Sequence, residues 1–406
     1  MKNKLLLLIA LLTFGALAEN VQNVTFQQRW PWNGKFDISY TLTKTTTKTS
    51  PVFAVKFYGK IGNGATFELT NIVDGDGYTG IVFGDGQKRV TWDASAQLGT
   101  RIVSDKLKIA VAAEDITEIA TYLKLDLTTY KMTASTTGPS VAAGASSKYA
   151  ELWLRRIENG TFVMGATRSE PWYYSDEKEH TVTLTKAYYI GVFELTQGQY
   201  NRINADGTST AVVPQGNISY NTLRGTSYGA TWPVKNDHRV DATSFFGKLR
   251  TKTGNGLIFD LPTEAQWEAA ARWKGTTGNG TNDYYGTCYW NNGVPFTDTY
   301  PYGINDVAWY YGTAGGKTHE VGLKAPSTSG TYDMHGNVVE WCLDWYADDI
   351  TSYVSDPDGP LFGSSRSDRG GCYPNPPKEC RIALRYSTTP SIGGTAYGCR
   401  VALVFE

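Results

Sequence analysis

The chain has 406 residues, of which 41% are hydrophobic and 19% are charged, and its formal net charge is −1. This length exceeds that of one ordinary domain, and the apolar content is too high and the net charge too low for a disordered chain. The near-neutral charge balance also excludes the basic surface that captures phosphate backbones, so nucleic acid is not an expected partner.

The first residues have the composition of a secretory leader. Lys2 and Lys4 precede an apolar run from Leu5 to Leu17, and the small residue Ala18 follows it. A basic start, a short apolar stretch and a small-x-small end are typical of a signal peptide, whereas a membrane span needs about 20 apolar residues. We therefore expect residues 1–18 to be a signal peptide and the mature chain to be exported to the periplasm, the medium or the cell surface, with no transmembrane span.

Residues 19–133 read as short strands separated by turns. The segments from Phe36 to Leu42 and from Lys106 to Val111 alternate apolar with polar residues, which favours strands with one buried face. Asn33-Gly34 and Asn63-Gly64 are turn signals. Strands of this length and spacing predict an all-β, immunoglobulin-like sandwich.

Residues 134–147 are small and polar, which is typical of a linker. A second domain is then expected over residues 148–406. Its clearest helix begins near Leu261, because Thr263 is placed to cap a helix start and Trp267, Ala270 and Ala271 form an apolar stripe with helical spacing.

The five cysteines all lie in the last third of the chain: Cys288, Cys342, Cys372, Cys380 and Cys399. An odd number leaves at least one thiol free or paired between chains. No two of them form a CxxC motif, so the pattern does not indicate a zinc or thioredoxin-type site.

Several sequence blocks in the second domain occur in the order found in one enzyme family. They are Phe162–Gly165, Glu179–Leu184, Glu194–Tyr200, Leu261–Glu268, Tyr332–Trp341, Arg369–Tyr373, Cys380–Arg385 and Gly398–Val401. Through these blocks, over about 250 residues, the chain resembles the formylglycine-generating enzyme, or sulfatase-modifying factor, family. The resemblance implies an α+β domain related to C-type lectins, with little regular secondary structure, and implies nothing about residues 19–147.

The same resemblance raises the question of catalysis. The family's enzyme oxidises a cysteine of a client sulfatase to formylglycine, using oxygen and a copper ion held by two cysteines five positions apart. Soft thiolates are the ligands that select Cu(I). The corresponding interval of this chain, 370–381, contains Cys372 and Cys380 but no cysteine pair with that spacing.

Cys372 and Cys380 therefore stay weak catalytic candidates with several interpretations. The prolines between them would let the segment fold back so that both thiols chelate copper. Alternatively, two of Cys372, Cys380 and Cys399 form a disulfide, or the thiols are free and buried, as unpaired cysteines often are.

A calcium site is the best-supported binding site that the resemblance implies. Asp333, Gly336, Val338 and Glu340 match the positions at which the family binds structural calcium, through two carboxylates and two backbone carbonyls. Calcium prefers six to eight oxygen ligands, which such a glycine-containing turn can supply. The alternative is that Asp333 caps a turn and Glu340 pairs with an arginine. His335, in the same turn, is expected to make a local hydrogen bond and not to act as a base.

Two functions remain open at this point. The first is an exported, calcium-stabilised recognition scaffold whose partner is a protein, a peptide or a glycan. The 12 Trp and 26 Tyr residues suit such a surface, although aromatic residues in a loop-rich fold also serve as core. The alternative is a copper-dependent oxidase acting on a client sulfatase.

Overall fold

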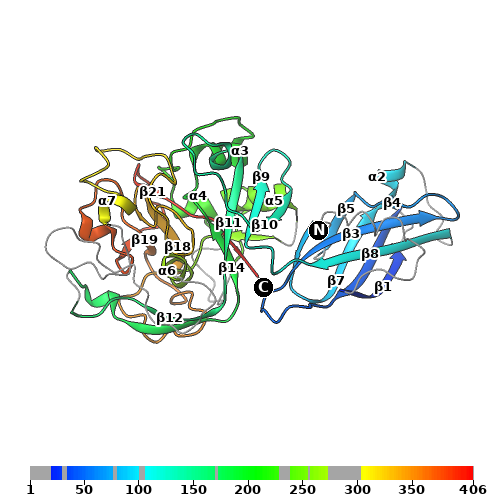
Figure 1. Cartoon of the computed structure of the whole chain (residues 1–406), viewed down its shortest axis with the longest axis horizontal. Helices are drawn as coiled ribbons and strands as arrows, with labels where there is room; N and C mark the ends of the chain where they lie inside the picture. The colour runs from blue at the N-terminus through cyan, green and yellow to red at the C-terminus, as the bar shows by residue number, and fades with distance from the viewer. Residues whose placement is uncertain are drawn as a thin grey trace.

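The computed structural model describes residues 20–29, 34–75, 80–99, 106–169, 172–227, 238–254, 257–272 and 303–405. The strands form two regions: an N-terminal β-rich region at the right of Figure 1, and a larger mixed region at its left. The expected signal peptide at residues 1–18 lies outside the described residues.

The N-terminal region consists of two sheets. One has the strand order β1-β2-β7-β5, and the other has the order β4-β3-β6 with β8 also paired to β3. The elements are β1 (Val21–Gln28), β2 (Lys35–Leu42), β3 (Val52–Ile61), β4 (Phe67–Glu68), β5 (Ile72–Gly75), β6 (Gly80–Phe83), β7 (Gly86–Asp93), α2 (Ala94–Leu98) and β8 (Leu107–Asp115).

Alternation along the strands creates the core between these sheets. In β2, Phe36, Ile38, Tyr40 and Leu42 are all buried, because every second side chain of a strand points to the same face. They share one hydrophobic cluster with side chains of β3, β7 and β8, including the fully buried Trp92. The prediction of a β-rich N-terminal region is confirmed.

The division between the two regions differs from the predicted one. Strands β9 (Tyr122–Asp126) and β10 (Met132–Ser135) precede the predicted boundary, yet they belong to the sheet β10-β9-β11-β14-β22-β15 of the second region. Strand β9 pairs with β11 (Glu151–Ile157) from Tyr122↔Arg155 to Asp126↔Glu151. The alternation within a strand shows that one face is buried but does not show which distant strand it pairs with. The sequence therefore did not predict that β9 pairs with β11.

The segment expected to be a linker, 134–147, is folded against the second region. Its first residues belong to β10, and the N–H of Gly144 donates a hydrogen bond to Glu320. Just after it, the buried Lys148 ammonium donates to the carbonyl of Val141 and to Glu320. Small polar residues form ordered turns as readily as flexible linkers, so composition alone did not distinguish the two.

The remaining elements of the second region are short. They are η2 (Ser146–Lys148), β12 (Gly160–Met164), η3 (Ser175–Glu177), β13 (His180–Leu184), β14 (Tyr188–Gly191), α3 (Gln197–Ala205), α4 (Tyr220–Arg224), α5 (Phe245–Thr253), β15 (Ile258–Asp260), α6 (Glu264–Arg272), α7 (Ile304–Val307), β16 (Ala308–Trp309), β17 (His335–Gly336), β18 (Val339–Trp345), β19 (Arg366–Arg369), η4 (Pro377–Cys380), β20 (Arg385–Thr388), β21 (Tyr397–Gly398) and β22 (Ala402–Val404). A second sheet has the order β20-β19-β18-β21.

Helix α6 begins where the sequence predicts. The Thr263 hydroxyl accepts the N–H of Gln266 at 3.1 Å, and the Gln266 side chain accepts the N–H of Thr263 at 2.9 Å. This reciprocal pair satisfies two backbone donors that a helix start otherwise leaves without partners. Trp267, Ala270 and Ala271 are fully buried, which confirms the predicted apolar stripe.

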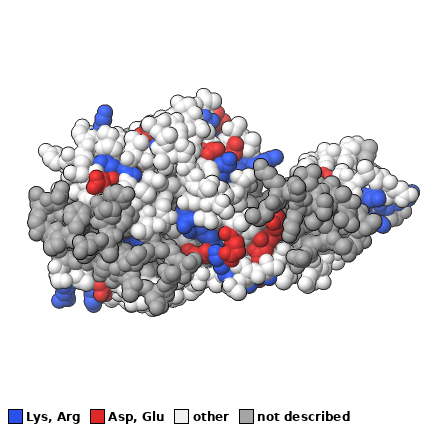
Figure 2. Space-filling model, in the orientation of Figure 1, with Lys and Arg blue, Asp and Glu red and all other residues white. Residues whose placement is uncertain are grey.

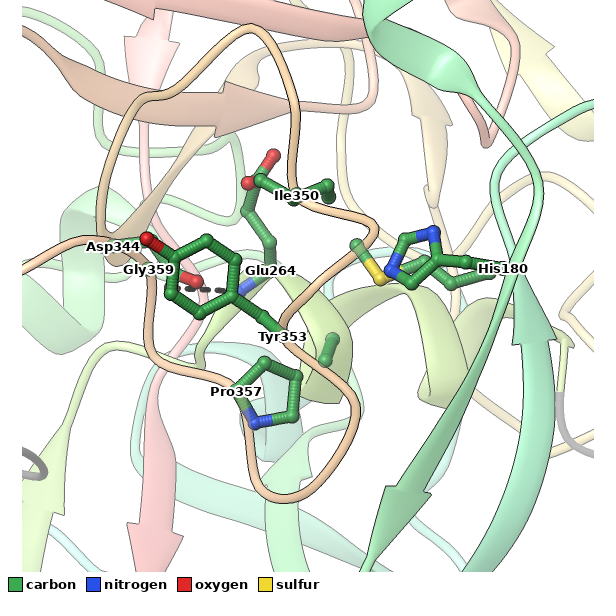
Figure 3. Close-up of a pocket in the computed structure, with 9 residues that line it drawn as sticks. His180, Glu264, Asp344, Ile350, Tyr353, Pro357 and Gly359 are labelled. Atoms are coloured by element: carbon green, nitrogen blue, oxygen red, sulfur yellow. Dashed lines mark hydrogen bonds between the residues drawn. The ribbon is translucent and has the colours of Figure 1, made fainter.

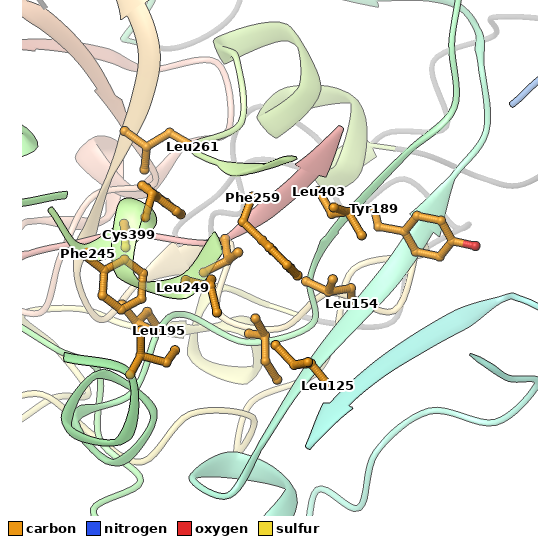
Figure 4. Close-up of a cluster of buried hydrophobic side chains, with 14 of the residues drawn as sticks. Leu125, Leu154, Tyr189, Leu195, Phe245, Leu249, Phe259, Leu261, Cys399 and Leu403 are labelled. Atoms are coloured by element: carbon orange, nitrogen blue, oxygen red, sulfur yellow. The ribbon is translucent and has the colours of Figure 1, made fainter. Parts of the chain in front are cut away.

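The largest core of the second region lies between its six-stranded sheet and the helices α4 and α5 (Figure 4). Leu154 and Leu403 come from the sheet, whereas Phe245 and Leu249 come from α5. This cluster extends to Val52 and Ile116 of the N-terminal part, and Phe83 contacts the rings of Tyr189 and Phe405. The two regions therefore share apolar contacts.

None of the helices in the described part of the chain combines the length and the apolar character required to cross a bilayer.

Candidate functional site

Of the four residues expected to bind calcium, Asp333, Gly336 and Val338 precede β18, and Glu340 is the second residue of that strand. Asp333 and Gly336 both have left-handed backbone conformations, with φ of 58° and 77°. A Cβ atom on Gly336 would lie 2.1 Å from the carbonyl oxygen of Trp309, because β17 runs beside β16. Only glycine fits at position 336, since any larger residue would collide with β16.

Asp333 is buried in this turn, and its two carboxylate oxygens differ in their hydrogen bonding. Its Oδ2 atom accepts the N–H of Gly322 at 2.6 Å, whereas Oδ1 has no hydrogen-bond partner among the described residues. Burial raises the pKa of this carboxyl group to about 6, and the nearby Glu340 adds to the rise. A buried, unpaired oxygen is energetically costly, and a bound cation would relieve that cost.

Glu340 is also buried, but both of its oxygens have partners. Oε1 accepts a hydrogen bond from Nη2 of Arg400 at 2.6 Å. Oε2 accepts two hydrogen bonds, from Nε of Arg400 at 3.0 Å and from Nε1 of Trp267 at 2.7 Å. This two-point ion pair is the arginine contact that was the alternative to calcium at this position.

Glu194 is a third buried acidic residue near Asp333 and Glu340, and the sequence analysis predicted no role for it. Its carboxylate accepts the backbone N–H of Val338 at 3.0 Å and the side-chain amide of Asn337 at 2.6 Å. Burial, followed by the charges of Asp333 and Glu340, raises the pKa of Glu194 well above its usual range. The available signal was an acidic residue inside the otherwise apolar stretch from Tyr188 to Leu195.

A calcium ion fits some of this donor set. Asp333 has a buried oxygen without a hydrogen-bond partner among the described residues, and Gly336 and Val338 follow it within five positions of the chain. Glu340 does not fit as it stands, because Arg400 and Trp267 occupy its oxygens. Within the described ranges, no three acidic, histidine or cysteine side chains are grouped so that they could hold a metal ion.

The two candidate cysteines lie next to each other but are buried. Cys372 is 7% exposed, and Cys380, at the end of η4, is 0% exposed. Burial raises the pKa of Cys372 to about 12, with Asp368 and Glu379 adding to the effect. Burial also raises the pKa of Cys380, and the Cys372 thiol contributes further. Both groups are therefore protonated near neutral pH, although metal ligation and nucleophilic attack need the thiolate.

The other cysteines give no alternative thiol pair in the described structure. Cys342 and Cys399 are fully buried in apolar clusters, and neither they nor Cys372 and Cys380 form a disulfide in this structure. Cys288 lies outside the described residues.

A small pocket lies beside the start of α6 (Figure 3). Its walls include Met164, His180, Asp344, Tyr353 and Pro357. One oxygen of Asp344 accepts the N–H of Glu264 at 2.9 Å. Burial, and then the charge of Glu264, raises the pKa of Asp344 well above its usual range. The enclosed space is about the size of one water molecule, so it has no room for an organic substrate.

Ionic contacts connect α6 to β19 and β20. The Glu264 carboxylate accepts both Nε and Nη2 of Arg385, at 3.0 Å and 2.7 Å. Glu268 accepts a hydrogen bond from Arg369 and another from Arg272. These two acidic residues thus hold α6 against β19 and β20.

His335 has a structural role. Its Nδ1 atom lies 2.7 Å from the carbonyl oxygen of Cys380, and burial lowers its pKa to about 4. The imidazole is therefore neutral at physiological pH. Its hydrogen-bond partner lies 45 positions along the chain and not in the same turn, so the expected local hydrogen bond is replaced by a contact with a distant segment.

Comparison with known proteins supports the fold and the family. Residues 149–404 match the family model described as a sulfatase-modifying factor enzyme 1-like domain. The formylglycine-generating enzyme of Thermomonospora curvata is 34% identical over 158 residues, which cover 35% of this chain and 48% of that enzyme. The Bos taurus formylglycine-generating enzyme is 30% identical over 289 residues, which cover 61% of this chain and 73% of that enzyme.

Among solved structures, PvdO from Pseudomonas aeruginosa has a TM-score of 0.48 and 22% identity, and the match covers 66% of this chain and 98% of PvdO. The matched segments span only 20% to 48% of the length of three of the sequence relatives. Because the family model covers more than half of the chain, this chain belongs to the sulfatase-modifying factor family through its residues 149–404.

Proposed function

We propose that the chain is an exported recognition protein of this family and that it does not generate formylglycine. The observation that carries the proposal is the burial of Cys372 and Cys380, which also raises the pKa of both thiols. Oxygen activation in the family's enzyme depends on a soft metal held by thiolates, and a protonated thiol binds such a metal poorly.

Exposed aromatic side chains support a binding role. Tyr311 is 77% exposed and Phe362 is 70% exposed, and Trp172 and Tyr174 also reach the surface. Trp and Tyr are enriched at protein interfaces, where one end of the ring system is buried and the other is hydrogen-bonded. The proposed partner is a protein, a peptide or a glycan outside the cytoplasm.

The N-terminal region has a separate part in this proposal. Its two packed sheets are compatible with an immunoglobulin-like sandwich, and such modules commonly present other domains at cell surfaces. We assign it the role of a docking module whose apolar contacts with the second region hold the recognition domain in place.

A direct assay separates recognition from oxidation. The reduced full chain is incubated in air with Cu(I) and a peptide containing Cys-x-Pro-x-Arg, and the peptide mass is followed. We expect no loss of sulfur from the peptide, with or without the Cys372→Ser substitution. Conversion of the peptide by the native chain, abolished by Cys372→Ser, would establish the copper oxidase and overturn the proposal.

Structural calcium is a further element of the proposed function. Asp333 would hold the ion through its unpaired oxygen, with the carbonyls of Gly336 and Val338, while Glu340 stays with Arg400. We expect calcium to raise the melting temperature of the full chain relative to chelator, and Asp333→Asn to abolish the difference. The exposed Asp348→Asn is the matched control and should keep it. Equal melting of the native chain in calcium and in chelator would remove calcium from the proposal.

A further inference from the structure

The segment that joins Cys372 to Cys380 folds back on itself. Gly370 and Gly371 have left-handed φ values of 93° and 73°. A Cβ atom on Gly371 would lie 2.9 Å from Cα and 3.0 Å from Sγ of Cys380. The sulfur of Cys380 therefore lies against the residue that directly precedes Cys372.

This approach places the two thiols in direct interaction. The Cys372 thiol is among the groups that raise the pKa of Cys380. Because consecutive Cα atoms are about 3.8 Å apart, the Cα atom of Cys372 lies within about 8 Å of that of Cys380. This range includes the span of about 4.4 to 6.8 Å over which disulfides join Cα atoms.

We propose that Cys372 and Cys380 form a redox-active dithiol, oxidised by a small-molecule disulfide such as oxidised glutathione to an intramolecular disulfide. This inference is independent of the proposed function, because it involves no copper and no peptide substrate.

The two cysteines have different roles in this reaction because their exposure differs. Cys372 is 7% exposed, whereas Cys380 is 0% exposed, so the oxidant reaches Cys372 first. The Cys372 thiol donates a 2.6 Å hydrogen bond to Oδ1 of Asn375. Rotation of the side chain away from Asn375 frees the sulfur for attack.

The reaction consists of two exchanges. The Cys372 thiolate attacks one sulfur of the oxidant, the oxidant's S–S bond breaks, and one glutathione leaves as a thiol after taking up the proton. The Cys380 thiolate then attacks Cys372 in the mixed disulfide, and the second glutathione leaves with the second proton. Two electrons and two protons thus pass from the dithiol to the oxidant. Because burial raises the pKa of both thiols, few thiolates are present and the exchange is slow near neutral pH.

Closure of the disulfide would immobilise a surface segment. The N–H of Tyr311 donates to the carbonyl of Asn375, which lies inside the closed loop, and Tyr311 is 77% exposed. The carbonyl oxygen of Cys380 lies 2.7 Å from Nδ1 of His335, in the turn that also contains Asp333 and Gly336. Oxidation would therefore fix the backbone beside an exposed aromatic side chain.

Peptide mapping of the native full chain tests the proposal. The reduced protein is incubated with oxidised glutathione, alkylated and digested with trypsin without reduction. Cleavage after Arg369, Lys378 and Arg381 places the two cysteines on separate peptides, 370–378 and 379–381. We expect these peptides to be joined, with a loss of two hydrogen atoms, and to separate after dithiothreitol. A stable glutathione adduct on Cys372, a link to Cys288, Cys342 or Cys399, or no reaction overnight at pH 8.5 would each overturn the proposal.

Variants distinguish the two roles. Cys380→Ser should accumulate a mixed disulfide with glutathione on Cys372, whereas Cys372→Ser should leave Cys380 unmodified. Circular dichroism of each variant reports whether it has folded. The mapping of the native chain decides the proposal even where a variant does not fold.

Discussion

Among individual residues, Asp368 has the titration that most clearly links pH to stability. It is 1% exposed, and its Oδ2 atom has no hydrogen-bond partner among the described residues. Burial raises the pKa of this carboxyl group from 3.8 to about 7. The folded chain thus keeps a proton on Asp368 up to about pH 7, whereas the unfolded chain releases it near pH 4.

Asp368 should therefore make the fold less stable as pH rises from about 4 to about 7. In this window the folded state binds more protons than the unfolded state, so the free energy of unfolding falls with pH and the loss is complete above about pH 7. We expect Asp368→Asn to remove this loss and to raise the free energy of unfolding at pH 8 by roughly 1–3 kcal/mol. Urea unfolding at pH 4 and pH 8 measures the effect.

The matched control is Asp348→Asn, which removes a carboxylate from an exposed position. It should leave the pH dependence of unfolding close to that of the native chain. If Asp368→Asn and Asp348→Asn behave alike at pH 8, the raised pKa of Asp368 has no consequence for stability.

Among helices and strands, α6 connects the local sequence to the candidate site. Thr263 caps its start, Trp267 donates to Glu340, and Glu264 and Glu268 pair with arginines of β20 and β19. A change at the start of this helix is therefore expected to affect both the contact of Trp267 with Glu340 and the buried ion pairs of Glu264 and Glu268.

We expect Thr263→Ala to lower the free energy of unfolding by about 1 kcal/mol, the usual cost of losing a helix cap. Thr263→Ser keeps the hydroxyl that accepts the N–H of Gln266, so it should retain most of the stability. Chemical denaturation of both variants makes the comparison. An equal loss in the two variants would show that the methyl group of Thr263, and not the capping bond, is important.

For the chain as a unit, the position of β9 and β10 determines where the protein can be divided. Strand β9 covers one edge of β11, and Leu123 and Leu125 are part of the main core. Ile116 and Ala120 belong to the same cluster. A fragment of residues 116–406 therefore contains this sheet, whereas a fragment of residues 148–406 lacks two of its strands.

We expect the 116–406 fragment to be soluble and to melt cooperatively. The 148–406 fragment should aggregate, because it exposes an unpaired strand edge and the apolar faces of Leu152 and Leu154. Soluble yield and thermal unfolding followed by circular dichroism test this prediction. A well-folded 148–406 fragment would support the division at residues 134–147 that the sequence predicted.

Features that depend on neighbouring residues were predictable from the sequence. The alternation in β2, the cap and apolar stripe of α6, and the ordered blocks that place the chain in its family all lie within short segments. Such patterns record whether a side chain faces the core or the solvent, so they show which elements form and which family they resemble.

Features that depend on contacts between distant segments were not predictable in this way. The sequence alone established an α+β member of the sulfatase-modifying factor family, preceded by a β-rich region and lacking the family's cysteine spacing. Only the folded chain showed that Arg400 occupies the oxygens of Glu340, that Glu194 joins the same cluster, and that β9 pairs with β11. The physical reason is that ion pairs and strand pairing form between residues far apart in the chain, and a local pattern indicates that a side chain is buried without indicating its partner.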